Sequence, residues 1–400
     1  MFSVFKKKPV TQAPEGLIDV RALIAASTLP SHLRLAEAYF QNMSLASGEF
    51  RKPFMGAEAV QLVPLLGVML SHLRFHSGVR ILDFGCGTGW LSQSLALMGA
   101  EVVAVDPSAT ALRLAEANTL SRYPELKGRI RYCEFDGEHL DVEDGQIDRV
   151  VCMDSFHHVP NPDVILREFG RVLASDGRAV FSEPGENHSR SAESQHAMRT
   201  FGVIENDIVL ADIWPLAQRA GFKELKVAPY AVPPLLSLQE FDDLRSRARA
   251  KATMNKLFTD VYSSLPTGGR QFVLMKDEPA RDSRFRDGLA AHLTAKTFSD
   301  GPLLKIDLIA RNTGTTTWRP SGQTAGSVNV GLITRGPGGD WDYEFRRHRS
   351  IPAQVHPGEV TTVTLTIAKS EFEGRELYAD LVAEQVIWFG QNGAAPIRVF

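Results

Sequence analysis

The sequence has few cysteines, no long apolar run and no long run of one charge, and each shortage excludes a class of protein. The three cysteines, Cys86, Cys133 and Cys152, are odd in number and widely spaced, so we expect neither a disulfide framework nor a cysteine metal site. The apolar stretch from Val60 to Leu73 is too short to cross a bilayer, and we expect no membrane span. The formal net charge is only −3, which argues against a nucleic-acid partner.

The N-terminus also lacks the apolar stretch of a secretory signal. Lys6 to Lys8 are followed at once by Pro9 and then by polar residues. Together with the few cysteines, this pattern predicts a cytoplasmic protein. Residues 1–29 are predicted to form a flexible leader that contains one short helix near Ile18 to Ala26.

A glycine-rich segment near residue 85 carries the most information. The apolar strand predicted over residues 79–84 runs into a loop with glycine at every second position, and a helical pattern follows. Glycine lets a backbone lie against a ligand, and the helix N-terminus offers unpaired N–H groups to an anionic group. A second strand, predicted over 101–106, ends in Asp106, whose carboxylate suits the two hydroxyls of a ribose. The layout predicts a site for a cofactor of the adenosine type.

The glycine spacing distinguishes between such cofactors. A dinucleotide fingerprint places its third glycine where this chain has Trp90, so the spacing argues against NAD and FAD. Asp83, just before the loop, would repel a pyrophosphate but would hold the ammonium group of an amino acid.

The run Leu82-Asp-Phe-Gly-Cys-Gly-Thr-Gly89 resembles the first motif of the class I S-adenosylmethionine (SAM)-dependent methyltransferases. Further motifs follow in the family's order, and the resemblance covers roughly residues 75–280. It implies a Rossmann-like α/β fold, SAM as cofactor and S-adenosylhomocysteine as product. The cofactor-binding residues that it implies are Asp83, Gly85, Cys86, Gly87, Gly89, Asp106, Asp136, Gly137 and Asp154.

Alternating strand and helix patterns predict a seven-stranded, mostly parallel, doubly wound sheet with helices on both faces. We assign a methyltransferase domain to residues 30–278, with a helical lid over 30–75 and a helical insertion over 238–265. The lid prediction depends on aromatic residues and a cation before the first motif. Packing of the same aromatic side chains on the sheet is the alternative.

The pattern changes to short alternating strands after about residue 280, which predicts a smaller all-β sandwich over 285–400. Its segment from Asn312 to Trp318 resembles the opening of immunoglobulin-like accessory domains in bacterial polysaccharide-biosynthesis proteins. We expect Trp318 and Trp388 in the core of the sandwich, and Trp341 in a loop that contacts a partner.

The candidate catalytic residues follow the fourth and fifth strands: His157, His158, Glu183 and His188. These strand ends are where open α/β sheets bind ligands, and histidine has a suitable pKa for a general base. The sequence does not choose between His157 and His158. Glu183 and His188, together with His158, would form a base network or a divalent metal site. Because the spacing matches no metal signature, we expect no metal. Glu205 either shapes an acceptor pocket or is a solvated surface residue.

These observations lead to a functional hypothesis: the enzyme O-methylates a sugar hydroxyl in a bacterial surface glycan or its precursor. Two alternatives stay open. The first is a methyltransferase for a small metabolite, with the sandwich used for dimerisation; the second is a SAM-binding scaffold without turnover, whose sandwich binds a protein partner. The acceptor is therefore a carbohydrate or another small molecule, and a protein partner or a homodimer would form through the sandwich.

Overall fold

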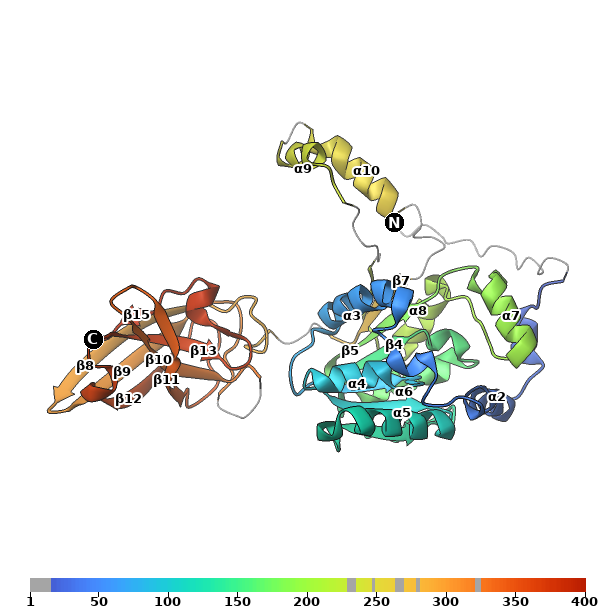
Figure 1. Ribbon diagram of the computed structural model, residues 1–400, viewed down its shortest axis with the longest axis horizontal. Helices are drawn as coiled ribbons and strands as arrows, with labels where there is room; N and C mark the ends of the chain where they lie inside the picture. Colours follow the sequence, from blue (N-terminus) through green and yellow to red (C-terminus); the bar gives the residue numbers. More distant parts are fainter. Residues whose placement is uncertain (1–15, 229–234, 247–248, 263–269, 278–280, 321–324) are drawn as a thin grey trace. The chain divides into compact units, whose positions relative to one another are not determined.

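The computed structural model describes residues 16–228, 235–246, 249–262, 270–277, 281–320 and 325–400. The chain divides into two compact units. The first contains residues 1–75 and 79–278, and the second contains residues 76–78 and 279–400. Figure 1 shows a mixed α/β unit and an all-β unit, and each is described here by itself.

The first unit is built on a seven-stranded sheet with the order β3-β2-β1-β4-β5-β7-β6. Neighbouring strands are parallel except for β7, which runs antiparallel to both β5 and β6. This topology confirms the predicted mostly parallel, doubly wound sheet. The strands are β1 (Arg80–Phe84), β2 (Glu101–Asp106), β3 (Ile130–Glu134), β4 (Ile147–Met153), β5 (Leu173–Glu183), β6 (Glu224–Ala228) and β7 (Arg270–Met275).

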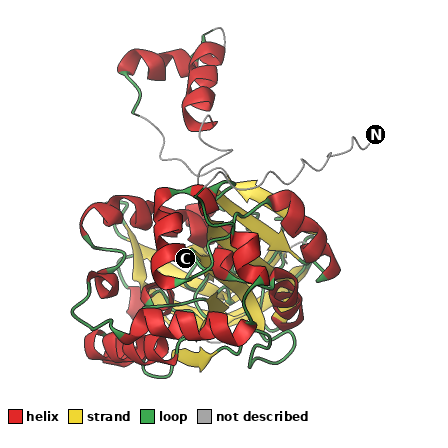
Figure 2. Ribbon diagram, turned by 90° about the vertical axis from the view of Figure 1, so that its right-hand side faces the viewer, coloured by secondary structure: helices red, strands yellow, loops and turns green. Residues whose placement is uncertain are grey.

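Helices cover both faces of this sheet, as Figure 2 shows. One face packs against α6 (Pro162–Val172) and α8 (Leu210–Arg219), and the other against α3 (Ala59–Leu73), α4 (Trp90–Leu97) and α5 (Ala109–Arg122). The central strands β1, β4 and β5 are mostly apolar on both sides because each face is buried, which is typical of parallel sheets. The remaining α-helices of the unit are α1 (Val20–Ala25), α2 (Leu29–Gln41), α7 (Ala192–Phe201), α9 (Leu238–Arg245) and α10 (Ala250–Tyr262).

Helix α3 contains the apolar stretch that the sequence analysis judged too short to cross a membrane. Among the described residues, the stretch Gly56–Leu73 is long and apolar enough to cross a membrane by length and composition alone. Two of its residues, Met69 and Leu73, are fully buried against the sheet, whereas Val60 and Val63 are exposed. The stretch therefore belongs to the core of this unit at one end and presents apolar side chains at the other.

A flexible leader was predicted over residues 1–29, of which residues 1–15 lie outside the described part of the chain. The described residues of this segment form ordered contacts instead. Helix α1 begins after Asp19, whose side chain accepts a hydrogen bond from the N–H group of Arg21. The backbone of Ile18 exchanges two hydrogen bonds with the side chain of Gln195 in α7. Val20 packs in a small apolar cluster that also contains residues of α7 and of the loop after it. Residues 18–25 are thus part of the fold of the first unit.

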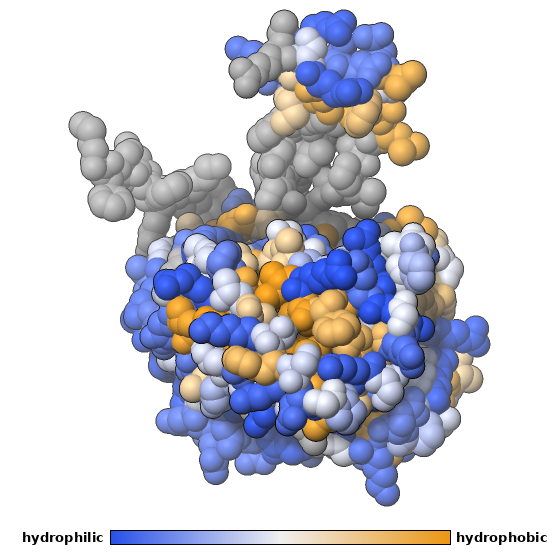
Figure 3. All heavy atoms as spheres, turned by 90° about the vertical axis from the view of Figure 1, so that its left-hand side faces the viewer, coloured by the Kyte–Doolittle hydropathy of each residue, from blue (hydrophilic) through white to orange (hydrophobic). Residues whose placement is uncertain are grey.

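The predicted helical insertion contains two helices, α9 and α10, between β6 and β7. Its residues 247–248 and 263–265 lie outside the described part of the chain. Ser237 and Glu240 form a capping box at the start of α9. Lys256 of α10 donates a hydrogen bond to Glu240, which joins the two helices. Figure 3 shows apolar and charged side chains on different sides of this pair. Its exposed apolar side chains include Leu238, Phe241 and Met254.

The second unit consists of two antiparallel sheets, which confirms the predicted smaller all-β domain. One sheet has the order β11-β10-β13-β14 with β15 also paired to β13, and the other has the order β12-β9-β8. Alternate residues of the strands fill one apolar core. The strands are β8 (Ala291–Asp300), β9 (Leu303–Asn312), β10 (Val328–Arg335), β11 (Trp341–Ser350), β12 (Val360–Ala368), β13 (Glu376–Ala383), β14 (Ile387–Trp388) and β15 (Ile397–Arg398).

The three tryptophans of the sandwich have different environments. Trp318 is fully buried and contacts Phe389 edge to face, which confirms its predicted core position. Trp388 is only half-buried, so its predicted core position is wrong: its ring covers Gly331, where an added Cβ would lie 2.5 Å from the ring. Trp341 begins strand β11, lies 37% exposed and contacts Tyr378 edge to face.

Candidate functional site

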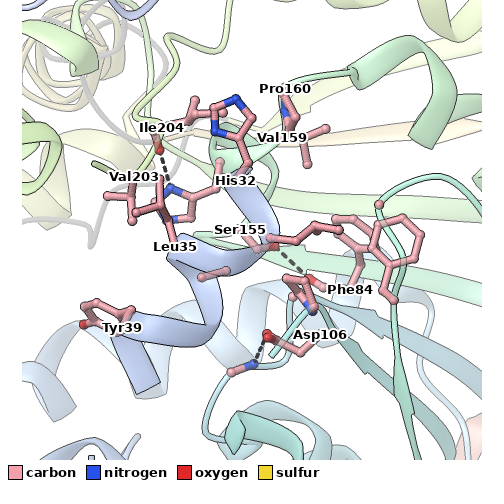
Figure 4. A pocket seen from close by; sticks show the side chains of 18 of the residues that line it. His32, Leu35, Tyr39, Phe84, Asp106, Ser155, Val159, Pro160, Val203 and Ile204 are labelled. Carbon is pink, nitrogen blue, oxygen red and sulfur yellow. Dashed lines mark hydrogen bonds between the residues drawn. The ribbon is translucent and has the colours of Figure 1, made fainter. Parts of the chain in front are cut away.

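A cavity of about 460 Å³ opens at the carboxyl ends of β1, β2 and β4, beneath helix α2. This volume lies in the range of small-molecule and cofactor sites, and the place is where open α/β sheets bind ligands. Figure 4 shows Asp106 and Phe84 at the strand ends, with His32, Leu35 and Tyr39 of α2 near them. Of the predicted site residues, the lining includes Gly85, Gly87, Asp106, Gly137, Asp154 and His158.

The glycine loop is shaped by close packing against the segment that follows β4. Gly85, Gly87 and Gly89 have φ angles of 71°, 49° and 75°, a region that disfavours side chains. A Cβ on Gly85 would lie 2.4 Å from the Cβ of Ser155. Ser155 in turn donates a hydrogen bond from Oγ to the carbonyl oxygen of Phe84, at 2.7 Å. Glycine is therefore required at position 85, because a side chain there would collide with Ser155.

Asp106 lies on the cavity wall and is held by two backbone donors. Its Oδ2 accepts a hydrogen bond from the N–H of Gly87, and its Oδ1 accepts one from the N–H of Ser108, both at 2.9 Å. Burial raises the pKa of Asp106 to about 6. Each carboxylate oxygen has a second lone pair, so the side chain can still accept hydrogen bonds from a ligand in the cavity.

Four predicted cofactor residues do not line the cavity. Asp83 is buried beneath the loop, where it accepts a hydrogen bond from Ser92 Oγ at 2.6 Å, and burial raises its pKa to about 7. Asp136 is exposed and accepts hydrogen bonds from two backbone N–H groups of the next turn. Cys86 and Gly89 form part of the loop behind its cavity face. The cofactor contacts proposed for these four residues stay predictions.

Helix α2 forms the wall of the cavity opposite the strand ends. Its Glu37 accepts hydrogen bonds from Ser108 Oγ and Thr110 Oγ1, both at 2.6 Å, and from the N–H of Thr110. A carboxylate at the first turn of α5 also interacts favourably with that helix terminus. Tyr39 and Phe40 of α2 line the cavity, whereas Phe50, in the following turn, is buried away from it. The predicted lid segment therefore supplies part of the cavity wall.

His157 and Glu183 form a buried pair beside the cavity. Glu183, at the end of β5, accepts a hydrogen bond from His157 Nδ1 at 2.7 Å and others from the N–H groups of Ser155, Phe156 and His157. Burial alone would lower the pKa of His157, but the contact with Glu183 raises it. With Nδ1 donating to the carboxylate, Nε2 of His157 is the ring atom left for other chemistry.

Glu205 brings His157 and His188 together. Its Oε2 lies 2.8 Å from His188 Nε2 and 3.7 Å from His157 Nε2. The loop that carries Glu205 is tied to the segment after β4, because Asn206 donates its N–H to the carbonyl oxygen of His157. Glu205 is also part of the cavity lining, and it is 7% exposed. Its alternative interpretation as a solvated surface residue is therefore wrong.

His158 faces the cavity from the same segment. Its Nδ1 lies within hydrogen-bond distance of the carbonyl oxygen of Ile204, as Figure 4 shows. Its ring contacts that of His157, with centroids 4.0 Å apart. The structure thus brings all four candidate catalytic residues into one cluster, with His158 on the cavity wall and His157, Glu183 and His188 behind it.

Part of the chain is similar to known methyltransferases. Residues 82–181 match a family model described as a methyltransferase domain. The ubiquinone biosynthesis O-methyltransferase of Xanthomonas oryzae pv. oryzae (strain PXO99A) is 34% identical over 106 residues, 26% of this chain and 43% of that protein. The protein of the same name from Albidiferax ferrireducens is 35% identical over 124 residues, 30% of this chain and 48% of that protein. The chain thus spans less than half the length of these curated relatives.

Solved methyltransferase structures also resemble the chain. A SAM-dependent methyltransferase from Mesorhizobium loti is 19% identical with a TM-score of 0.38, over 53% of this chain and 96% of that one. A phosphoethanolamine N-methyltransferase of Haemonchus contortus, solved in complex with SAM, is 18% identical with a TM-score of 0.39, over 66% of this chain and 61% of that one. The chain carries a methyltransferase domain over the matched residues 82–181.

Proposed function

We propose that this protein is a SAM-dependent O-methyltransferase whose acceptor is a small molecule with an apolar face. One observation carries the proposal: a single cavity joins the glycine loop and Asp106 at one end to His158 and Glu205 at the other. A methyl donor and an acceptor hydroxyl must lie next to each other for an in-line transfer, so proximity supplies much of the rate.

The cavity residues fit SAM. Asp106 retains lone pairs for the ribose hydroxyls, and the side-chain-free edge at Gly85 and Gly87 leaves room for the donor's amino-acid portion. Phe135 and Gly137 line the part of the cavity next to β3, where an adenine ring would pack. When bound, SAM supplies a methyl group on a sulfonium, which the acceptor oxygen takes in one step as the C–O bond forms and the C–S bond breaks.

The histidine and carboxylate cluster would accept the proton of the acceptor hydroxyl. His158 is its member on the cavity wall, and Glu205 lies beside it. Glu183 is a positioning residue, because it fixes the ring of His157 and the backbone turn that carries both histidines. Helix α2 excludes water from the opposite side through Leu33, Leu35 and Tyr39.

The apolar wall favours a small acceptor with an apolar face over a strongly hydrated one. Residues of α2 and the pair Val203 and Ile204 give this wall its character. A sugar hydroxyl of a glycan or glycan precursor remains the second candidate, and the sandwich supports it through its resemblance to accessory domains of polysaccharide-biosynthesis proteins. Cytoplasmic location is part of the same proposal.

Label transfer tests the function directly. The purified protein is incubated with methyl-labelled SAM and a lysate of the source cells, and glycan, lipid, protein and small-molecule fractions are separated. We expect label in the small-molecule or lipid fraction, and less label with the Asp106→Ala variant at a SAM concentration below the dissociation constant of that variant. Label confined to the glycan fraction would select the second candidate. Measurable SAM binding without label in any fraction would contradict turnover and favour a scaffold.

A further inference from the structure

We propose that His157, His188 and Glu205 bind one divalent transition-metal ion at the acceptor end of the cavity. The binding itself needs no assumption about activity, whereas the role of the ion rests on the proposed function. The three residues follow β4, β5 and α7, so no spacing in the sequence joins them. This proposal replaces the expectation of no metal, which was based on sequence spacing alone.

The ligand atoms are arranged as a small metal site requires. One ligand atom from each of the three side chains can be chosen so that all lie within 4.8 Å of one another. Glu205 Oε2 is 2.8 Å from His188 Nε2 and 3.7 Å from His157 Nε2. Ligands about 2.1 Å from a tetrahedral zinc ion lie about 3.4 Å from each other. Small side-chain shifts would therefore place all three around one ion.

Glu183 supplies the supporting contact that metal-bound histidines commonly have. It holds His157 Nδ1 at 2.7 Å, so that Nε2 points to Glu205. A carboxylate on the outer nitrogen fixes the tautomer and makes the ligating nitrogen more basic. The sequence placed Glu183 itself in a base network or among the ligands of a metal site, whereas its position behind His157 suits a supporting contact to a metal ligand.

The site is held in place from each of its three segments. His188 lies in a short turn, His188–Arg190, where Asp207 accepts the N–H of Ser189 at 2.8 Å. The side chain of Gln195 donates to the carbonyl oxygen of Ser189 at 2.7 Å. Asn206, next to Glu205, donates its N–H to the carbonyl oxygen of His157. Little reorganisation is required to bind an ion.

The donor set selects the class of ion. Two imidazole nitrogens and one carboxylate suit zinc, iron(II) and cobalt(II), whereas magnesium and calcium favour sites made of oxygen ligands. On binding, the proton that His188 Nε2 donates to Glu205 Oε2 is exchanged for one on Nδ1, so that the neutral ring can ligate through Nε2 and the carboxylate through Oε2.

Three protein ligands leave at least one coordination position open, and Glu205 borders the cavity. An acceptor oxygen at that position would have a lower pKa, which favours loss of its proton before methyl transfer. The site would therefore activate the hydroxyl that the proposed function requires.

Cobalt titration of the full-length protein, freed of metal with a chelator, tests the proposal. We expect one equivalent of Co²⁺ to bind with the visible absorption bands of nitrogen and oxygen coordination, and zinc to compete for the same site. His188→Ala and Glu205→Gln should each weaken binding by at least about 100-fold, because each removes one of three ligands. Glu183→Gln should weaken it by about 10- to 100-fold, as supporting contacts do.

His196→Ala is the matched control, because His196 lies exposed on α7 outside the cluster. It should bind Co²⁺ as the unaltered protein does, and circular dichroism of each variant checks that the fold is kept. Absence of saturable binding, or equal binding by His188→Ala and Glu205→Gln, would overturn the metal site. SAM binding measured by calorimetry on the metal-free protein tests the proposed function separately, so the two proposals can fail independently.

Discussion

Each unit of this protein buries an aspartate in a strand, and the two carboxylates look alike in isolation. Asp106 is 5% exposed and Asp380 is fully buried. Each accepts two backbone hydrogen bonds, from Gly87 and Ser108 in the first case and from Leu381 and Gly390 in the second. Burial raises the pKa of both to about 6.

The difference lies in what surrounds them. Asp106 borders a cavity, so its remaining lone pairs point to space that a ligand can fill. Asp380 has no such space, because an added Cβ on Gly390 would lie 2.8 Å from its Oδ2. It fastens the turn Phe389–Asn392 to strand β13. A perturbed pKa alone therefore does not identify a site; the accompanying cavity does.

The largest expected effect concerns the sandwich. Trp318→Ala removes its largest fully buried side chain, and we expect the free energy of unfolding of this unit to fall by about 3–5 kcal/mol. The affinity for SAM should not change, because Trp318 belongs to the core of the second unit. Urea unfolding of the full chain, with pulsed hydrogen exchange read on peptides of each unit, measures both. Loss of protection in β1 and β2 would contradict the independence of the units.

The pH dependence of Asp380 gives the next effect. Its pKa is raised from 3.8 to about 6, so the folded unit holds a proton that the unfolded chain has lost. The contribution of Asp380 to the free energy of unfolding of the sandwich is largest below about pH 4. It falls by roughly 2–3 kcal/mol as the pH rises to about 6. Asp380→Asn cannot titrate. The unfolding free energy of the unaltered sandwich, minus that of the variant, should therefore fall across this window; a constant difference would contradict the buried, protonated carboxyl.

Asp106→Ala separates the two aspartates by function. Hydrogen bonds to a charged group contribute about 1.5–3 kcal/mol each, so the dissociation constant for SAM should rise at least about tenfold. Asp106→Asn should be milder, since one acceptor oxygen remains. Asp380→Ala is the matched control and should leave the constant unchanged. Calorimetry measures all three, and unaltered SAM binding by Asp106→Ala would exclude the ribose contact.

Glu37→Gln should give the smallest effect. The amide still accepts one hydrogen bond, but the contact of α2 with Ser108 and Thr110 weakens. We expect the dissociation constant for SAM to rise about two- to fivefold, because a smaller fraction of the protein has α2 closed on the cavity. Faster hydrogen exchange in α2 should accompany it. Unchanged exchange there would show that other contacts hold this helix.

The sequence predicted many strands and helices correctly, because the regular spacing of their apolar residues identifies them. Strand β2 has the predicted bounds, and the alternating apolar residues of β9, β12 and β13 face the core. Strands β8 and β11 were missed, because they lie at sheet edges and carry many exposed polar residues. Helix α7 was missed too, because its segment is rich in polar residues.

Residues of the site were predictable from the sequence only where they belong to one continuous segment of the chain. The loop at Gly85 and the acid at Asp106 belong to a local motif, and both line the cavity. Glu205 was not recognised as a member of the cluster, because the contact with His188 depends on how α7 packs. The nearest signal is its position a few residues before Ile208, a buried residue of the sheet's core. Contacts between residues that are far apart in the chain produce no periodic pattern in the sequence.

The connection between β6 and β7 has an evolutionary consequence. Ala228, the last residue of β6, pairs directly with Gln271 near the start of β7. The residues between them, with helices α9 and α10, thus leave and re-enter the sheet at neighbouring points. A tight turn could bridge these two positions without changing the order of any strand. An insertion or deletion at this point of the chain would therefore leave unchanged the order of the strands whose carboxyl ends border the cavity.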